Sequence, residues 1–441
     1  MTALPVANAS LLDEGTAAAE AFNLAYGNSK GSKNKFFISN DIHPQTIDVV
    51  VTRAEALGVS VTVGDLKSLP ESLTDYYGIL LQYPNTYGTV NDYKSLTARA
   101  KSSKAVVIAA VDLLSLTHLT PPGEWGANIA VGSAQRFGVP MMYGGPHAGF
   151  MAVEEPLMRK IPGRIIGVSK DADGGRCLRM AMQTREQHIR RDKATSNICT
   201  AQALLANTAA SYAVYHGPEG LKAIAGRIHS MASVVTAGLK SAGYCVVNDG
   251  AFFDTLKVAL PKNVSASSLH SKAVSSGFNL RPIDDSHVGL AFDETHDKND
   301  IVKLLQVFGV DTSDSNLSSL LSKASSGIPS SVKRTSKFLT HPVFNSHRSE
   351  TQMLRYLKFL ESKDFALNYC AIPLGSCTMK LNATSEMIPI TWPEFANIHP
   401  FVPADQALGY AELISSLNDT LCKVTGFAAM SAQPNSGAQG E

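Results

Sequence analysis

The amino-acid sequence predicts an α/β fold with a mostly parallel sheet. Short apolar runs alternate with helical patterns through the first two hundred residues, which is the rhythm of strands and crossover helices. The runs are short, mainly apolar and rich in residues that favour strands, as expected for strands covered on both faces. The expected strands lie at residues 35–39, 59–63, 78–82, 105–111, 129–132 and 164–168, and the helical patterns include 43–57 and 92–101.

A smaller α+β domain is expected after this sheet. A helix is predicted from residue 197 to about 216, where Gly217 and Pro218 interrupt it. The next helix carries apolar side chains at helical spacing from Leu221 to Leu239. Strands are then predicted at 244–247, 253–259 and 279–282, and helices at 266–275 and 300–308.

The patterns divide the chain into four segments. Residues 1–215 form the large domain and 216–312 the small domain. Residues 313–336 are rich in serine and are expected to be a linker. Residues 337–441 begin a second unit, with a helix near 349–360 and a proline-rich, aromatic stretch at 388–403.

Two stretches near opposite ends of the chain resemble one another, at residues 2–20 and 425–441. Each leads through a turn of small residues, GTA at 15–17 and SGA at 436–438, toward an expected helix start. The free N–H groups of a helix start and the helix dipole can bind an anion, most often a phosphate. An ordinary capped helix is the alternative. A repeat so far apart indicates a duplicated large domain, and the chain is expected to be a fragment.

The composition limits the classes of function. Of the 441 residues, 44% are hydrophobic and 17% charged, which is typical of a soluble globular protein. The net charge of +1 gives no electrostatic reason to expect nucleic acid or a membrane as partner. The six cysteines form no Cys-x-x-Cys pair, which favours free thiols and no metal site. No targeting leader is visible.

Three loops carry polar side chains that could act in a site. The run GGPHAG at 144–149 contains His147, a candidate proton carrier or stacking partner for a planar cofactor, although a structural role is the common alternative. The run REQHIRRDK at 185–193 is read as a solvated helix face, an interface or an anion site. The run PLGSCTMKLN at 373–382 crowds hydroxyl, thiol and amide groups together.

Taken together, the sequence resembles the pyridoxal-phosphate-dependent glycine decarboxylase family, the P-proteins of the glycine cleavage system. The resemblance covers essentially the whole chain. The motifs that carry it are LLDEGTAAAEA at 11–21, GSAQRFGVP at 132–140, the 144–149 loop, residues 180–205, PLGSCTMKLN at 373–382, IHPFVP at 398–403 and QPNSGAQGE at 433–441.

The resemblance implies a fold-type-I, aminotransferase-like large domain with a smaller α+β domain, followed by the start of a second such unit. It implies decarboxylation of glycine on pyridoxal phosphate and transfer of the aminomethyl group to the lipoyl arm of the H-protein. A homodimer is implied for the full-length protein, with no nucleic acid or membrane partner. The expected location is the mitochondrial matrix for a eukaryotic source, and the cytoplasm otherwise.

The resemblance also assigns roles to residues. The lysine that forms the Schiff base is expected beyond Glu441, in the second half, so no catalytic residue is expected in this fragment. At the corresponding place the first half has Gln135, which has no nucleophilic amine. Asp112 resembles the carboxylate that pairs with the pyridine nitrogen. The cofactor phosphate would be held by Ser436, Gly437 and Ala438, and the site would be lined by Tyr83, His147, Ser376, Cys377 and Thr378.

Two other interpretations stay open. The chain could be another fold-type-I enzyme in which Lys380 binds the cofactor, or a non-catalytic subunit that pairs with a lysine-bearing chain. Cys377 is expected to be either a redox brake on activity or a small buried residue.

Overall fold

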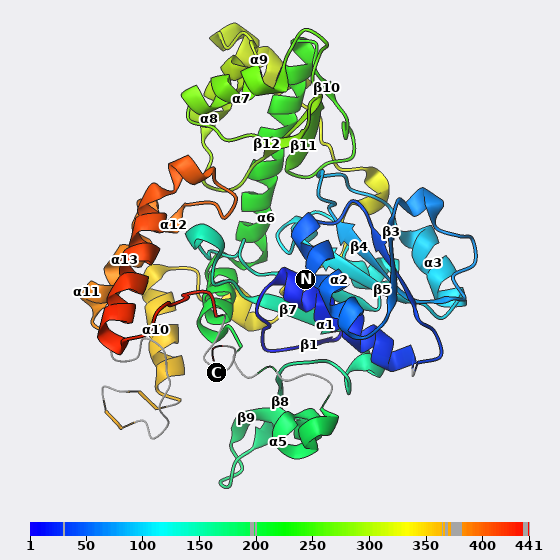
Figure 1. The fold of residues 1–441 in the computed structure, drawn as a ribbon, viewed down its shortest axis with the longest axis vertical. Coiled ribbons are helices and arrows are strands. Elements are labelled where there is room, and N and C mark those ends of the chain that lie inside the picture. Colours follow the sequence, from blue (N-terminus) through cyan, green and yellow to red (C-terminus); the bar gives the residue numbers. More distant parts are fainter. Residues whose placement is uncertain are drawn as a thin grey trace.

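A seven-stranded sheet forms the centre of the molecule (Figure 1). The computed structural model describes all residues of the chain except 30, 195–197, 199–200, 364, 367–368, 372–381, 435–439 and 441. The strand order in the sheet is β1-β7-β6-β5-β4-β2-β3. Its strands are β1 (Val6–Ala7), β2 (Lys35–Ser39), β3 (Ser60–Gly64), β4 (Tyr76–Tyr83), β5 (Val106–Val111), β6 (Ile129–Ser133) and β7 (Gly149–Val153). The neighbouring strands from β3 to β6 pair in parallel. Strand β7 pairs antiparallel with both of its neighbours, β6 and β1. The predicted α/β class with a mostly parallel sheet is therefore confirmed.

Alternate side chains of the central strands enter two hydrophobic cores. Ile79 and Leu81 of β4 join the core on one face, and Leu80 joins the core on the other. This alternation follows from the two-residue period of a strand. Both faces are thus covered, which explains why these strands are mainly apolar. The helices around the sheet are α1 (Glu14–Ser29), α2 (Pro44–Ala56), α3 (Lys94–Ser102) and α4 (Pro122–Trp125). Helix α5 (Gln187–Arg190) lies apart from the sheet, at the lower end of the molecule in Figure 1.

One long helix connects the large and the small domain. Helix α6 (Ala203–Ser241) extends from the level of the sheet into the small domain (Figure 1). It is kinked at Gly217, whose φ of 62° suits glycine, and Pro218 follows. The predicted interruption lies at this kink, yet one helix spans both predicted ones.

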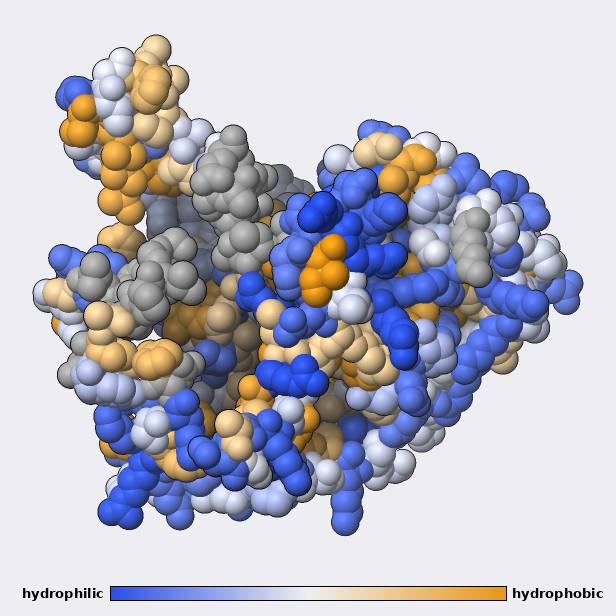
Figure 2. All heavy atoms as spheres, turned by 90° about the horizontal axis from the view of Figure 1, so that it is seen from below, coloured by the Kyte–Doolittle hydropathy of each residue, from blue (hydrophilic) through white to orange (hydrophobic). Residues whose placement is uncertain are grey.

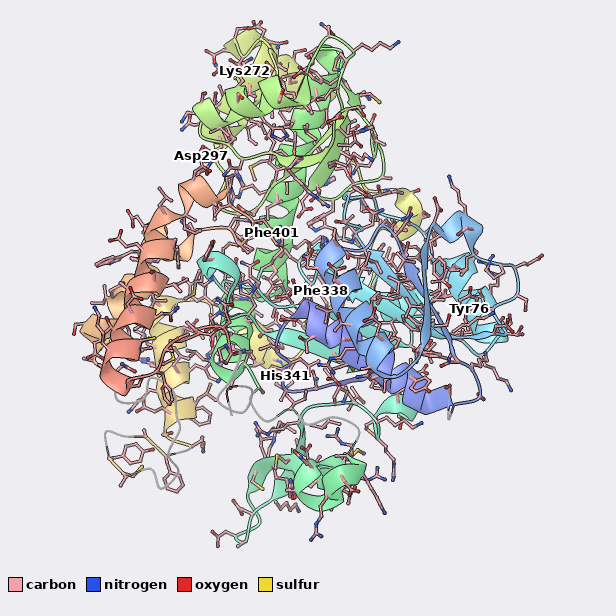
Figure 3. The ribbon with its side chains drawn as sticks, in the orientation of Figure 1. Tyr76, Lys272, Asp297, Phe338, His341 and Phe401 are labelled. Carbon is pink, nitrogen blue, oxygen red and sulfur yellow. The ribbon has the colours of Figure 1, made fainter. Side chains whose placement is uncertain are left out.

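The small domain packs a four-stranded antiparallel sheet against helices. The strand order is β10-β11-β13-β12. Its elements are β10 (Cys245–Val246), β11 (Thr255–Ala259), α7 (Ala266–Ser275), β12 (Arg281–Asp284), β13 (His287–Ala291) and α8 (Lys298–Val307). Asp297 caps the start of α8, and Lys272 donates to the carbonyl of Val307 at its end at 2.6 Å. Figure 3 labels both side chains on this domain. The predicted α+β character is confirmed, and β13 was not predicted.

Two expectations differ from the structure. Residues 164–168 do not join the large sheet: β8 (Ile165–Lys170) pairs with β9 (Arg176–Ala181) in a separate ribbon. The large sheet ends instead with the antiparallel strands β7 and β1. In the serine-rich segment 313–336, helix α9 (Asp314–Lys323) forms and buries Leu320 in the core. The segment therefore has structure of its own, while the domain boundaries remain a prediction.

The helices of the segment 337–441 lie along one side of the molecule (Figure 1). Their helices are α10 (Glu350–Glu361), α11 (Thr384–Met387), α12 (Pro393–Ala396) and α13 (Leu408–Thr425). Among the described residues of this segment, only Ala396 and Ala407 are buried hydrophobic residues. Within the described part of the chain, no helix is long and apolar enough to cross a membrane.

Candidate functional site

The carboxyl ends of the parallel strands bring several polar side chains to one edge of the sheet. This edge is where ligands bind in open α/β sheets. Asp112 follows β5, and Gln135 and Arg136 follow β6, the strand beside β5. Asp41 and His43 follow β2. The sequence prediction that Asp112 ends an apolar strand is thus confirmed.

Arg136 connects this edge to the small domain. Its guanidinium donates to Asp112 Oδ2 at 2.9 Å and also to Asp254 Oδ2. Asp254 directly precedes β11 and is 7% exposed. Burial raises the pKa of Asp112, against the opposing effect of Arg136. Burial alone would lower the pKa of Arg136, but the two carboxylates raise it, so the arginine stays charged.

The guanidinium therefore satisfies the carboxylate that the resemblance assigns to a cofactor nitrogen. Asp112 also accepts from the backbone N–H groups of Leu114 and Ser115, at 3.0 and 3.3 Å. Sequence reasoning missed the Arg136–Asp254 pair, because the two residues are 118 positions apart. The signal in the sequence was an arginine in the loop that follows an apolar strand.

The side chain of Gln135 is occupied by its own loop. Its Nε2 donates to the carbonyl of Val139 at 2.6 Å, and its backbone N–H donates to Ser133 Oγ at 3.1 Å. These bonds hold the turn that follows β6. Gln135 is thus a loop-forming residue in this structure.

The first helix start is closed by a carboxylate of the chain itself. Helix α1 begins at Glu14, so residues 15–17 form the first turn of the helix and not the predicted turn before it. The backbone N–H of Thr16 donates to Asp13 Oδ1 at 2.7 Å. A carboxylate thus takes the position that a bound anion would need at this helix start. Asp13 lies beside the strand edge, because a Cβ on Gly149 would come within 2.5 Å of its carbonyl oxygen.

Tyr83 lies in the core of the large domain. Its ring is fully buried and packs against Tyr93 and Trp125, with centroids 6.1 and 5.8 Å away. Its hydroxyl has no hydrogen-bond partner among the described residues, and burial raises its pKa above the usual range. The structure thus places Tyr83 in the aromatic core, and its lining role remains a prediction.

The 144–149 loop and the residue before it contact the second unit. A Cβ on Gly144 would lie 3.3 Å from the Cβ of Pro400. The backbone N–H of Tyr143 donates to the carbonyl of Ile398 at 2.8 Å, and the Tyr143 ring lies 4.6 Å from that of Tyr410. Two motifs of the resemblance, 144–149 and 398–403, are thus brought together. His147 is partly buried, and its Nε2 has no hydrogen-bond partner among the described residues.

The other predicted site residues lie outside the described residues. These are Ser376, Cys377, Thr378 and Lys380 of the 373–382 loop and the phosphate-site candidates Ser436, Gly437 and Ala438. Their roles remain predictions. Within the described ranges, no group of three or more His, Cys, Asp or Glu residues could hold a metal ion.

A second polar cluster also joins the large and small domains. Arg281 of β12 donates to the carbonyl of Thr86 at 2.5 Å and to its Oγ1 at 3.0 Å. The same hydroxyl lies 2.9 Å from Nδ1 of His43. Burial, and secondarily Arg281, lowers the pKa of His43 to about 4. His43 is therefore neutral at neutral pH.

The fold and this strand edge define the chain as a fold-type-I, pyridoxal-phosphate-enzyme-like α/β protein, the class expected from the resemblance. Residues 1–308 match the family model described as "Glycine cleavage system P-protein". The chain belongs to the glycine cleavage system P-protein family.

Similar proteins support the same family. The chain is 54% identical to a glycine dehydrogenase (decarboxylating) of Photobacterium profundum over 443 residues, which cover all of this chain and 46% of that protein. It is also 54% identical to a mitochondrial one of Pisum sativum, covering all of this chain and 41% of that protein. The chain thus spans about half the length of the curated relatives it matches.

A solved structure has a similar fold. It is a crystal structure of glycine decarboxylase (P-protein) of the glycine cleavage system in inhibitor-bound form. The TM-score is 0.65 at 33% identity, and the match covers 70% of this chain and 72% of that chain.

Proposed function

We propose that this chain forms the first half, and the beginning of the second half, of a glycine dehydrogenase (decarboxylating). The observation that carries the proposal is the identity of 54% to proteins of that name along the whole chain. The whole protein would decarboxylate glycine and pass the aminomethyl group to the lipoylated H-protein, as a homodimer. Its location would be the mitochondrial matrix for a eukaryotic source, as for the Pisum sativum relative, and otherwise the cytoplasm.

The cofactor would be pyridoxal phosphate, whose ring accepts the electrons left when carbon dioxide departs. The described residues of the first half do not fit this group. Arg136 already neutralises Asp112, and Asp13 closes the first helix start. Gln135 has no amine that could capture an aldehyde. We infer that the first half supports a site built mainly by the second half, without binding the cofactor itself.

Completing the chain tests the proposed function. The completed chain consists of these 441 residues followed by the part of the Photobacterium profundum relative that lies beyond the matched stretch. We expect the 441-residue chain alone to exchange no labelled carbon dioxide into the carboxyl group of glycine, because the resemblance places the Schiff-base lysine beyond Glu441. The completed chain should catalyse this exchange when pyridoxal phosphate and the lipoylated carrier are present.

Absorbance of the bound cofactor gives a second measurement on both proteins. Exchange by the 441-residue chain alone would contradict the assignment of the lysine. A well-folded completed chain that binds the cofactor but catalyses no exchange would contradict the proposed activity.

A lysine at position 135 should not create a second cofactor site. In Gln135→Lys, Arg136 still neutralises Asp112 and the Asp13 carboxylate still occupies the start of α1. Each carboxylate near a bound phosphate costs about 1 kcal/mol at a partly exposed site. We expect incubation with pyridoxal phosphate followed by borohydride to give no more modification at residue 135 than at the exposed control Gln187→Lys. A stable reduced adduct mapped to residue 135 would show that the pocket still accepts the cofactor.

A further inference from the structure

The β8–β9 ribbon stands apart from both larger sheets. It lies at the lower end of the molecule in Figure 1, and its two strands pair only with each other. Its base is fastened to the large domain: the Arg185 guanidinium donates to the carbonyls of Ile161 and Gly163, the latter at 3.0 Å. An isolated two-stranded hairpin is at best marginally stable in water. The ribbon therefore needs support along its strands.

The two faces of the ribbon differ in their surroundings. Ile165 points to one face and packs against the core around α1. The other face carries Ile166 opposite Met180 and Val168 opposite Leu178. Ile166, Val168 and Leu178 are 49%, 65% and 66% exposed. Ile166, Val168 and Leu178 thus form an apolar stripe on this face.

Basic side chains surround the apolar stripe. Residues 164–193 contain eight Lys or Arg and four Asp or Glu, a net charge of +4 in a chain whose total is +1. Lys170 and Arg176 continue the stripe toward the hairpin turn, on the same face. Figure 2 views this end of the molecule and shows apolar side chains bordered by hydrophilic ones. A partner should therefore present apolar side chains within an acidic surface.

A permanent partner fits these observations better than a transient one. A carrier that comes and goes would leave the ribbon and its apolar stripe in water most of the time. A second copy of this ribbon would bring two surfaces of charge +4 together. Helices α10 and α13 of the second unit also expose apolar side chains to solvent. Each of these side chains is at least 48% exposed: Leu354, Phe359, Leu413 and Leu417.

We propose that the apolar stripe is a docking surface for the rest of the second half, the part of the relatives' length that this chain does not match. The inference rests on the proposed function, because it takes the long relatives as the form in which this chain works. The ribbon then holds the first half against the second, through an apolar centre with an acidic rim on the opposite surface. The ribbon helps to join the two halves, and it makes no contact with the reacting atoms.

Hydrogen exchange of the ribbon amides tests this surface. We expect the amides of Ile165–Lys170 and Arg176–Ala181 to exchange at least about tenfold more slowly in the completed chain than in the 441-residue chain. The small-domain hairpin of β11 and β13 is the internal control and should exchange equally in both. Equal exchange of the ribbon in both proteins would overturn the proposal. Slow exchange that appears only when the lipoylated carrier is added, or only in a self-associated 441-residue chain, would also overturn it.

Paired variants test the apolar stripe itself. In the completed chain, Val168→Asp with Leu178→Asp should return ribbon exchange to the rate of the 441-residue chain. The control Leu57→Asp with Val63→Asp changes two side chains of the large domain that are 46% and 44% exposed, and should leave ribbon exchange unchanged. If both double variants changed ribbon exchange equally, the result would contradict the apolar stripe as the contact surface. Glycine exchange activity is measured on the same samples: activity without ribbon protection contradicts only the docking surface, and protection without activity contradicts only the proposed function.

Discussion

Arg136→Met is expected to lower the free energy of unfolding by about 3–5 kcal/mol, because removing one partner of a buried ion pair leaves uncompensated charge. Here two carboxylates, Asp112 and Asp254, would face each other without the cation between them. Arg136 and Asp112 are only 22% and 21% exposed, so water cannot replace the lost hydrogen bonds fully. Urea unfolding measured at neutral pH gives the change.

The same experiment separates lost charge balance from lost packing. Arg136→Met combined with Asp112→Asn and Asp254→Asn should recover much of the stability, because no unpaired charge remains. The matched control is Lys240→Met, whose pair with Asp249 is about half exposed, at 56% and 39%. It should cost less than about 1 kcal/mol. If Arg136→Met costs no more than this control, the ion-pair cluster does not hold the two domains together.

Lowering the pH should destabilise the folded chain at pH values well above those at which carboxylates titrate. Burial, with a smaller effect of Arg281, lowers the pKa of His43 to about 4. Burial, followed by nearby positive charges, lowers that of His118 to about 4. Burial also lowers the pKa of His229, whose Nε2 accepts from the backbone N–H of Gly327 at 3.2 Å. All three histidines are thus neutral in the folded chain.

The direction of this change in stability follows from the number of protons that the folded and unfolded chains bind. In the unfolded chain these histidines protonate near pH 6.5, whereas in the folded chain His43 and His118 stay neutral until about pH 4. The pKa of His229 is shifted in the same direction by burial. As the pH falls through this window the unfolded state binds more protons, so the free energy of unfolding falls. Between pH 6.5 and 5, His43 and His118 together should cost about 2–3 kcal/mol, with less from the partly exposed His118. His229 adds to this loss, because its pKa is lowered as well. His296, whose pKa is raised by Asp293, offsets part of this loss.

Urea unfolding at about pH 7 and about pH 5 measures the loss. His43→Asn should reduce the pH dependence by about one proton, since the histidine that resists protonation is gone. The exposed residue His188, changed to asparagine, is the control and should leave the pH dependence unchanged. Equal stability at the two pH values would contradict the neutral, buried state of these histidines.

Local patterns in the sequence predicted much of the fold. The runs that became β2, β4, β5 and β6 were mainly apolar, and this pattern depends on burial on both faces of a sheet. The kink at Gly217 followed from the backbone chemistry of glycine and proline. Strands β1, β7, β9 and β13 were missed, and β8 was assigned to the wrong sheet. Strand pairing depends on partners far along the chain, which local periodicity does not contain.

The sequence by itself determined the α/β class, the family through its long motifs, and the chemical incapacity of Gln135 as an amine. Only the tertiary structure decided what the candidate site residues contact. It placed Tyr83 in an aromatic core and brought Tyr143 and the adjoining 144–149 loop to the 398–403 motif. It also set Arg136 between Asp112 and Asp254. The physical reason is that propensity and burial patterns act over a few residues, whereas ion pairs and side-chain contacts join residues that only the folded chain brings together.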